Sequence, residues 1–167
     1  MTRLAKYSAD LYVNLEKETG ISTGVKQNGS LTVALTEHRH EEILRQASMA
    51  KAFDVEVNEI SISELKSFHP FLNVDGVKGA VHLPLDGQGD PANIAMALAK
   101  GARDLGVKIF EDTKVTGLNT HNNSVSGVHW ENENGKGLIK TENAANCAGM
   151  WARDFAESHG VTVPLHA

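Results

Sequence analysis

The chain has 167 residues, with 16 lysines and arginines against 21 aspartates and glutamates, so its formal net charge is −5. This acidic balance argues against non-specific binding to nucleic acid or to an anionic membrane surface. Apolar residues make up 41% of the sequence and charged residues 22%, which excludes a disordered or low-complexity chain. The length suits one compact unit, residues 1–167, that can bury a core of its own.

The single cysteine, Cys147, excludes an intramolecular disulfide framework and a zinc site built from several cysteines. The longest aliphatic run, residues 94–99, is far shorter than the roughly 20 residues that a membrane-spanning helix needs. The first residues mix charged and apolar side chains, unlike a signal peptide. We therefore expect a cytoplasmic protein, with neither nucleic acid nor a membrane among its partners.

The first half of the chain alternates apolar stripes at helical spacing with short strand-like runs. Thr36 and Ser63 are expected to cap helices, because their hydroxyl groups can accept from free N–H groups of the first turn. The expected elements are a helix over 4–19, a hairpin of strands 24–27 and 30–35 turned at Asn28-Gly29, a helix over 37–50, a strand around 55–57, and a short helix from Ser63 to Pro70.

In the second half, Asp90 and Pro91 suit the N-cap and first turn of a helix that ends at Gly106. Its buried stripe is expected to be Ile94, Leu98, Ala102 and Leu105. The strands expected around it are 77–83, 107–110, 114–119, 126–130, 138–141 and a buried strand over 144–149, followed by a helix over 151–159. Strand, helix, strand and then a meander predict a mixed α/β fold.

The run Gly87-Gln-Gly-Asp-Pro-Ala92 resembles a G-x-G-x-x-A phosphate-binding turn, with Glu111 where a ribose-binding acid belongs. However, Asp90 would place a carboxylate where a pyrophosphate should lie, and Pro91 removes a backbone donor. A glycine-rich turn followed by a helix cap is therefore the favoured interpretation, ahead of an NAD-binding turn.

The eight histidines show no metal-ligand spacing with one another or with Cys147. His82 is the one histidine near the glycine-rich loop, and a half-buried strand residue is the favoured interpretation. Ala148 and Gly149 form a strand end without bulky side chains, which lets a flat or phosphorylated ligand approach the backbone. Trp151 is then either a core anchor or a lid on that ligand.

The run Ala144-Ala-Asn-Cys-Ala-Gly-Met-Trp-Ala-Arg153 resembles the V-N-x-A-G-x-W-A-R signature of flavin-dependent amine oxidoreductases of the D-amino-acid-oxidase superfamily. Further runs resemble the dimethylglycine and sarcosine dehydrogenase branch, in consistent order along the chain. They are Tyr7–Tyr12, Glu18–Gly20, Gly29–Leu31, Asp86–Pro91, Ala97–Ala102 and Val163–His166.

The resemblance implies an FAD-dependent oxidoreductase that oxidises a small-molecule amine, an N-methylated glycine of the dimethylglycine or sarcosine type, by hydride transfer to flavin. Val115 matches the strand whose backbone contacts the adenine part of FAD. Ala148, Gly149 and Trp151 match the segment that passes close to the dinucleotide. These four residues are the expected cofactor-binding residues, and no catalytic or metal-binding residue is assigned.

Family members begin with a strand and a true G-x-G-x-x-G turn, which this sequence does not show before Tyr7. The chain thus resembles a middle fragment: about 20–83 would be part of an antiparallel-sheet substrate domain. About 84–160 would be part of an FAD/NAD(P)-binding-type domain, with a strand–helix–strand unit and a β-meander. His166 lies near the family's substrate-side histidine without matching it, so it receives no role.

Without the G-x-G-x-x-G turn, the isolated chain is expected to retain no FAD and to be inactive. The alternative is a non-catalytic binding or oligomerisation module derived from such an enzyme. Exposed sheet edges pair readily with other chains, so such a module would form a homodimer through its uncovered edges.

Overall fold

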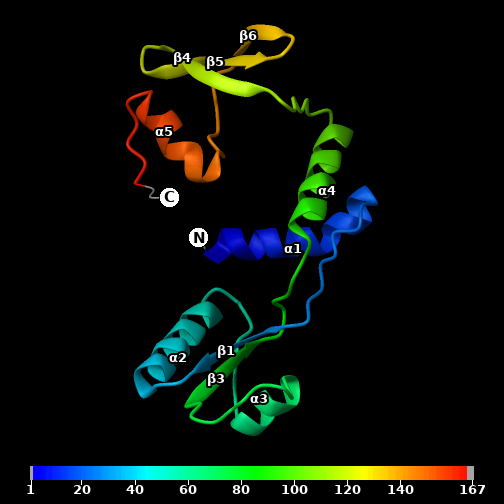
Figure 1. Ribbon diagram of the computed structural model, residues 1–167, viewed down its shortest axis with the longest axis vertical. Helices are drawn as coiled ribbons and strands as arrows, with labels where there is room; N and C mark the ends of the chain where they lie inside the picture. Colours follow the sequence, from blue (N-terminus) through cyan, green and yellow to red (C-terminus); the bar gives the residue numbers. More distant parts are fainter. Residues whose placement is uncertain (1, 165–167) are drawn as a thin grey trace. The chain divides into compact units, whose positions relative to one another are not determined.

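The structure is a computed structural model that describes residues 2–164. Contacts between Cα atoms divide the chain into two compact units, unit 1 (residues 1–108) and unit 2 (residues 109–167). Each unit is mixed α/β and contains one three-stranded antiparallel sheet (Figure 1). The mixed α/β fold expected from the sequence is confirmed.

The sheet of unit 1 is formed by strands that are distant in the sequence. β1 (Ser30–Ala34) and β2 (Asn58–Ile60) both pair with β3 (Gly79–Leu83), which is the central strand. Thr32 lies opposite Val81 in the β1–β3 pair. Because side chains alternate along a strand, the sheet can offer an apolar surface to each side.

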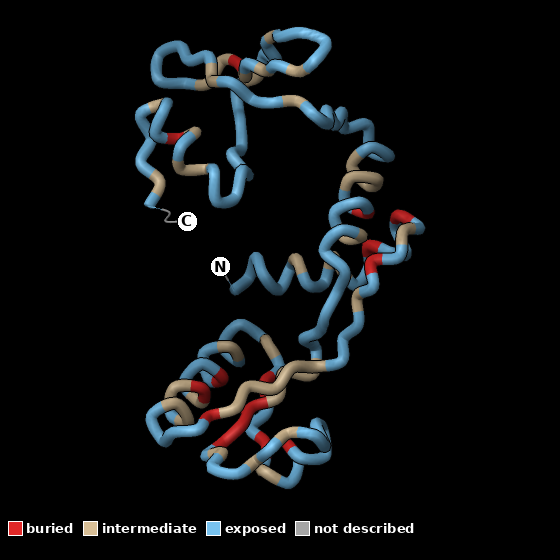
Figure 2. Tube along the Cα trace, viewed as in Figure 1, coloured by how far each residue is buried: buried red, intermediate tan, exposed pale blue. Residues whose placement is uncertain are grey.

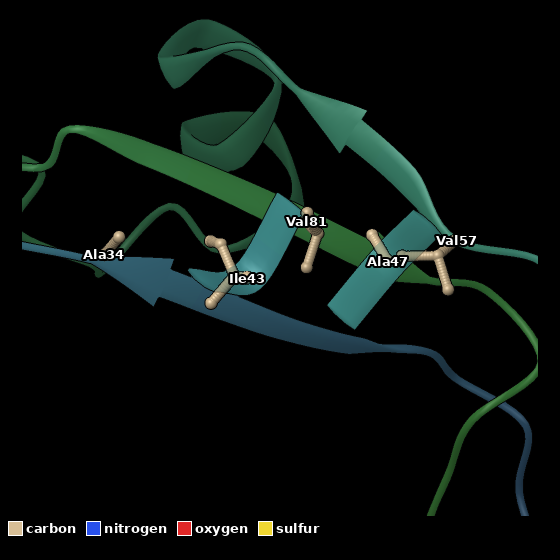
Figure 3. Close-up of a cluster of buried hydrophobic side chains, with 5 residues drawn as sticks. All are labelled: Ala34, Ile43, Ala47, Val57 and Val81. Atoms are coloured by element: carbon tan, nitrogen blue, oxygen red, sulfur yellow. The ribbon is translucent and has the colours of Figure 1, made fainter. Parts of the chain in front are cut away.

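Helix α2 (Glu37–Lys51) packs on one face of this sheet. Thr36 caps the helix as predicted, because its hydroxyl oxygen accepts a 3.2 Å hydrogen bond from the Arg39 N–H. The core beneath α2 consists of small and branched side chains from both layers (Figure 3): Ala34, Ile43, Ala47, Val57 and Val81.

Helix α3 (Ile62–Phe68) contributes to a second core cluster, made of Ile60, Leu65 and Ala80. Its N-cap is Ser61, so the prediction of Ser63 was wrong by two residues. Ser61 and Glu64 form a capping box, in which each side chain bonds the backbone N–H of the other residue. This reciprocal pair explains why the helix begins at Ile62.

Helices α1 (Thr2–Thr19) and α4 (Pro91–Asp104) pack against each other in unit 1. Asp90 caps α4 as predicted, accepting from two N–H groups of the first turn. The predicted apolar stripe is only partly correct, because Ala97 is fully buried whereas Leu105 is 88% exposed. The buried position is a small side chain, which lets two helices approach closely.

Unit 2 contains a β-meander of β4 (Lys114–His121), β5 (Ser124–Asn132) and β6 (Gly135–Lys140), as the sequence predicts. Asn122 and Asn123 both have positive φ at the first turn, which is the backbone conformation of a tight two-residue hairpin. A 3₁₀ turn, η1 (Gly149–Trp151), and helix α5 (Ala152–Glu157) follow the meander.

The hairpin predicted over residues 24–35 was wrong. Lys26 instead forms a two-way backbone bridge with Gln88, and Ser30–Ala34 pairs with β3. Gly29 has positive φ, but its N–H donates to the carbonyl oxygen of Asp86, 57 positions along the chain. The turn therefore directs the chain to a distant partner, which a local pattern cannot reveal.

Two predicted strands are missing from the described residues of the second half. Residues 107–110 form no strand, and residues 144–149 form a loop rather than a buried strand. In Figure 2 the segment between β6 and α5 has the colour of exposed residues, in agreement with exposed positions at 142–151. Apolar composition predicted burial there, but neither segment pairs with a strand among the described residues.

The assignment of about 20–83 to a substrate domain and about 84–160 to an FAD domain stays a prediction, as does the single compact unit. The contacts divide the chain at a different place, between Lys108 and Ile109. No helix within residues 2–164 is both long and apolar enough to span a bilayer.

Candidate functional site

Unit 2 contains a pocket of about 530 Å³ between its sheet and the segment that leads into α5. This volume is within the range of roughly 300–1,000 Å³ that is typical of small-molecule sites. The lining residues are apolar or neutral: Val115, Leu118, Val125, Val128, Ala144, Ala145, Asn146, Cys147, Ala148, Trp151 and Phe155.

Strands β4 and β5 supply one wall of the pocket. Leu118 and Val128 are directly opposite each other in the register of the two strands. Val115 lies on the same wall because the register shifts between Val115 and Gly117, where the strand is irregular. The apolar side chains of this sheet face are thus gathered at the pocket.

The loop before α5 supplies the opposite wall, and one asparagine side chain shapes it. The Asn146 amide accepts from the Ala148 N–H at 3.2 Å and donates to the Ala152 carbonyl oxygen at 3.1 Å. An asparagine side chain that bonds nearby backbone groups in this way stabilises a turn where no strand hydrogen bonds form. The small side chains around it leave the pocket open.

Gly149 and Trp151 follow at the 3₁₀ turn. Gly149 has a positive φ of 57°, and a Cβ atom built on it meets nothing within 4 Å. Trp151 is 69% exposed and lines the pocket, so it is not a core anchor of this unit. The sequence left two interpretations of Trp151 open, a core anchor or a residue beside a ligand site. In the structure its side chain lines a pocket.

The pocket carries no charged side chain among its lining residues. An uncharged, flat ring therefore suits it better than a phosphate group, which needs cations or a cluster of free N–H donors. For FAD, the adenine end fits this chemistry, whereas nothing in the lining would balance the pyrophosphate charge. The apolar lining thus suits only the uncharged part of a dinucleotide.

Three of the four predicted cofactor-binding residues, Val115, Ala148 and Trp151, line this pocket, and Gly149 lies next to them in the chain. Sequence reasoning missed Leu118 and Phe155. Alternation along the strand could not have identified Leu118, because it is three positions from Val115 and the register shift between them brings both to one wall. Phe155 could have been found from its helical spacing to Trp151.

The glycine-rich turn at Gly87 is a turn followed by a helix cap, as the favoured interpretation held. A Cβ atom at Gly87 would lie 2.0 Å from the Lys26 carbonyl oxygen, so the glycine allows two backbones to approach. The Asp90 carboxylate occupies the N–H groups of Ala92 and Asn93, which a phosphate would otherwise use. The turn offers no phosphate cradle.

His82 is half-buried on β3, and its ring lies 4.4 Å from that of Phe68. This agrees with the interpretation of a half-buried strand residue. Within residues 2–164, no three histidine, cysteine, aspartate or glutamate residues gather in a way that could hold a metal ion. His166 lies outside the described residues.

The whole of the chain, residues 1–167, matches the DAO family, described as FAD-dependent oxidoreductase. The chain belongs to this family. Human mitochondrial sarcosine dehydrogenase is 39% identical over 158 residues, which are 92% of this chain and 17% of that protein. Rat mitochondrial dimethylglycine dehydrogenase is 33% identical over 158 residues, which are 95% of this chain and 18% of that protein.

The fold agrees with this family. The structure of L-proline dehydrogenase from P. horikoshii matches with a TM-score of 0.83 and 29% identity, over 98% of this chain and 42% of that chain. A mouse mitochondrial pyruvate dehydrogenase phosphatase regulatory subunit is also 36% identical, over 99% of this chain and 19% of that protein. The chain therefore spans about a fifth of the length of these curated relatives.

Proposed function

We propose that this chain is part of an FAD-dependent oxidoreductase that oxidises an N-methylated glycine, of the sarcosine or dimethylglycine type. The observation that carries the proposal is the match of residues 1–167 to the DAO family, together with relatives named sarcosine and dimethylglycine dehydrogenase. When bound, the flavin would accept a hydride from the N-methyl carbon of the substrate. The cytoplasmic location expected from the sequence is a further part of this proposal.

In this proposal the pocket of unit 2 holds the adenine end of FAD. Val115 and Ala148 would contact the ring from opposite walls, and Trp151 would shield it from water. Three features of the pocket support this placement. Its two walls are apolar, its volume suits a small ring system, and no side chain among the described residues covers the backbone of Gly149. Excluding water from the ring strengthens the few polar contacts that orient it.

As an isolated polypeptide, the 167 residues should not retain FAD. A pocket for the adenine end supplies only part of the binding free energy, and the charged pyrophosphate finds no partner in its lining. The protein purified with excess FAD should therefore lose its visible flavin absorbance on gel filtration. A flavin that stays bound at one per chain would contradict this expectation.

The adenine site is tested with adenosine, which lacks the pyrophosphate. Adenosine should shift the amide NMR signals of Val115 and Ala148 in the isolated chain. In Ala148→Leu these shifts should fall at least severalfold, because the larger side chain fills the pocket. The matched control is His129→Leu, which places the same side chain on the opposite face of β5. Equal shifts in both variants would reject the site.

The substrate class is tested with a flavin-loaded protein that carries these residues. Under anaerobic conditions, sarcosine or dimethylglycine should bleach the flavin, whereas glycine, which has no N-methyl group, should not. Bleaching by L-proline but by neither N-methylglycine would replace the proposed substrate class with that of the structural neighbour. This outcome would leave the adenine site unaffected.

A second candidate is a non-catalytic binding module, favoured by the relative that is named as a regulatory subunit. Its large exposed side chains, among them Phe71 and Leu105, would then contact a partner or a second copy. Sedimentation at increasing protein concentration distinguishes a homodimer from a monomer. A strict monomer at every concentration would exclude pairing through the sheet edges.

A further inference from the structure

His159 is outside the pocket lining, yet its ring joins the two walls of the pocket through their backbones. Its Nε2 atom accepts a 2.9 Å hydrogen bond from the N–H of Leu118 on β4. Its Nδ1 atom lies 2.9 Å from the carbonyl oxygen of Phe155 on α5. Leu118 and Phe155 both line the pocket.

These two contacts distinguish between the two tautomers of the ring. An Nε2 atom that accepts from an N–H carries no proton, so the proton of a neutral imidazole must be on Nδ1. That N–H then points toward two oxygen acceptors, the Phe155 carbonyl and, also at 2.9 Å, the Ser158 hydroxyl. The geometry is therefore that of the tautomer with the proton on Nδ1.

Both elements that contact the His159 ring, β4 and α5, need such contacts for their stability. β4 is an edge strand that pairs only with β5 among the described strands, so backbone groups on its outer side lack a sheet partner. α5 has six residues, which is too short for a stable helix without tertiary contacts. The His159 ring also packs on the Phe155 ring, with centroids 4.8 Å apart. One side chain thus closes a strand edge and anchors a short helix.

We propose that His159, as the neutral Nδ1–H tautomer, is a positioning residue that holds α5 against β4 and so sets the separation of the two pocket walls. The ring lies close to the β4 backbone at Gly117. Even a Cβ atom built on Gly117 would be in ordinary van der Waals contact with the ring, 3.5 Å from Nε2. Only the identity of the ligand rests on the proposed function. The tautomer and the two backbone contacts can be measured without any ligand.

The first test is the ¹⁵N NMR spectrum of the histidine rings in the unmodified chain at neutral pH. His159 should show a protonated Nδ1 and an unprotonated Nε2 that is coupled to the Leu118 amide. An Nε2-protonated or doubly protonated ring would overturn the proposal. This readout needs no variant, so a folding defect cannot obscure it.

The second test compares variants by hydrogen exchange of the Leu118 amide and by NOEs between Leu118 and Phe155. His159→Ala should speed exchange roughly five- to tenfold, as expected for one lost hydrogen bond, and weaken the NOEs. His159→Gln should restore slow exchange, because its Oε1 atom can accept in place of Nε2. The control is His129→Ala, an exposed histidine on β5, which should change neither readout. No loss in His159→Ala, or no rescue by Gln, would overturn the proposal.

The third test is adenosine affinity, which should fall in His159→Ala and return in His159→Gln. If the tautomer and exchange results hold while adenosine binds to no variant, the adenine proposal fails and the positioning role stands. If adenosine binds equally to all variants, the pocket width does not depend on His159 and the positioning role fails.

Discussion

At the scale of single residues, small side chains determine where two segments of this chain can approach. Gly87 lies against the Lys26 backbone, and Ala97 is the fully buried residue of α4, the helix that packs against α1. Ala148 and Gly149 instead leave space that no described residue of unit 2 fills. The same residue types therefore close one site and open another, according to what packs against them.

Gly87→Ala should destabilise unit 1 by about 2 kcal/mol, because the added Cβ would lie 2.0 Å from a backbone oxygen and force the bridge apart. Chemical denaturation of the full chain measures this loss. The control is Gln88→Ala, which keeps both backbone hydrogen bonds between Gln88 and Lys26. A Gly87→Ala variant as stable as the control would mean that the bridge is not needed.

At the scale of elements, those with local signals were predicted and those with distant partners were not. The helix caps at Thr36 and Asp90 and the Asn122-Asn123 turn act within three residues, so the sequence specifies them directly. Strand 24–27 was misplaced because its partner, at Gln88, is about 60 residues away. At the site, the residues of 144–151 were identified, but their exposure depends on packing that the sequence pattern does not report.

Asp90→Ala should cost about 1 kcal/mol of stability, because two N–H groups at the start of α4 lose their acceptor. Thermal unfolding of the full chain measures the change. Asp104→Ala is the matched control, since the same substitution at the other end of α4 removes only an exposed ion pair with Lys100. An equal effect of both substitutions would contradict the capping role.

The capping box of α3 gives a pH-dependent prediction. The Ser61 hydroxyl, followed by the Ser61 N–H, holds the pKa of Glu64 below its ordinary value of 4.5. Ionised Glu64 therefore stabilises the fold above pH 4.5, and this contribution is lost as the pH falls through the lower pKa of the folded state. The stability difference between the unmodified chain and Ser61→Ala should shrink on acidification.

An NMR titration checks the same prediction directly. In Ser61→Ala the pKa of Glu64 should rise toward its ordinary value. Ser67→Ala, which removes a hydroxyl that bonds the Glu64 carbonyl oxygen and not its carboxylate, should leave the pKa of Glu64 where it is. If the two variants titrate alike, the Ser61 hydroxyl is not the cause of the shift.

At the scale of the whole chain, the two units differ in what holds them together. Both clusters of buried apolar side chains lie in unit 1, and neither includes a residue of 109–164. Unit 2 depends on the hydrogen bonds of its meander and on contacts such as those of His159. A unit with few buried apolar contacts opens locally at low free energy.

Amide hydrogen exchange of the full chain should therefore proceed in two groups. Amides paired in β1 and β3 should exchange slowest, and amides paired in β5 and β6 should exchange at least tenfold faster. Exchange followed residue by residue by NMR measures both groups in one sample. A single common rate for both sheets would mean that the chain unfolds as one cooperative unit.

The one sulfhydryl of the chain lies in the pocket lining and is solvent-exposed. A thiol-reactive dye would thus attach at Cys147 alone, without any mutagenesis, beside the surface where adenine is proposed to bind. Its emission would report directly on whatever enters that space. Cys147 is therefore a natural attachment site for a fluorescent probe of ligand binding in this pocket.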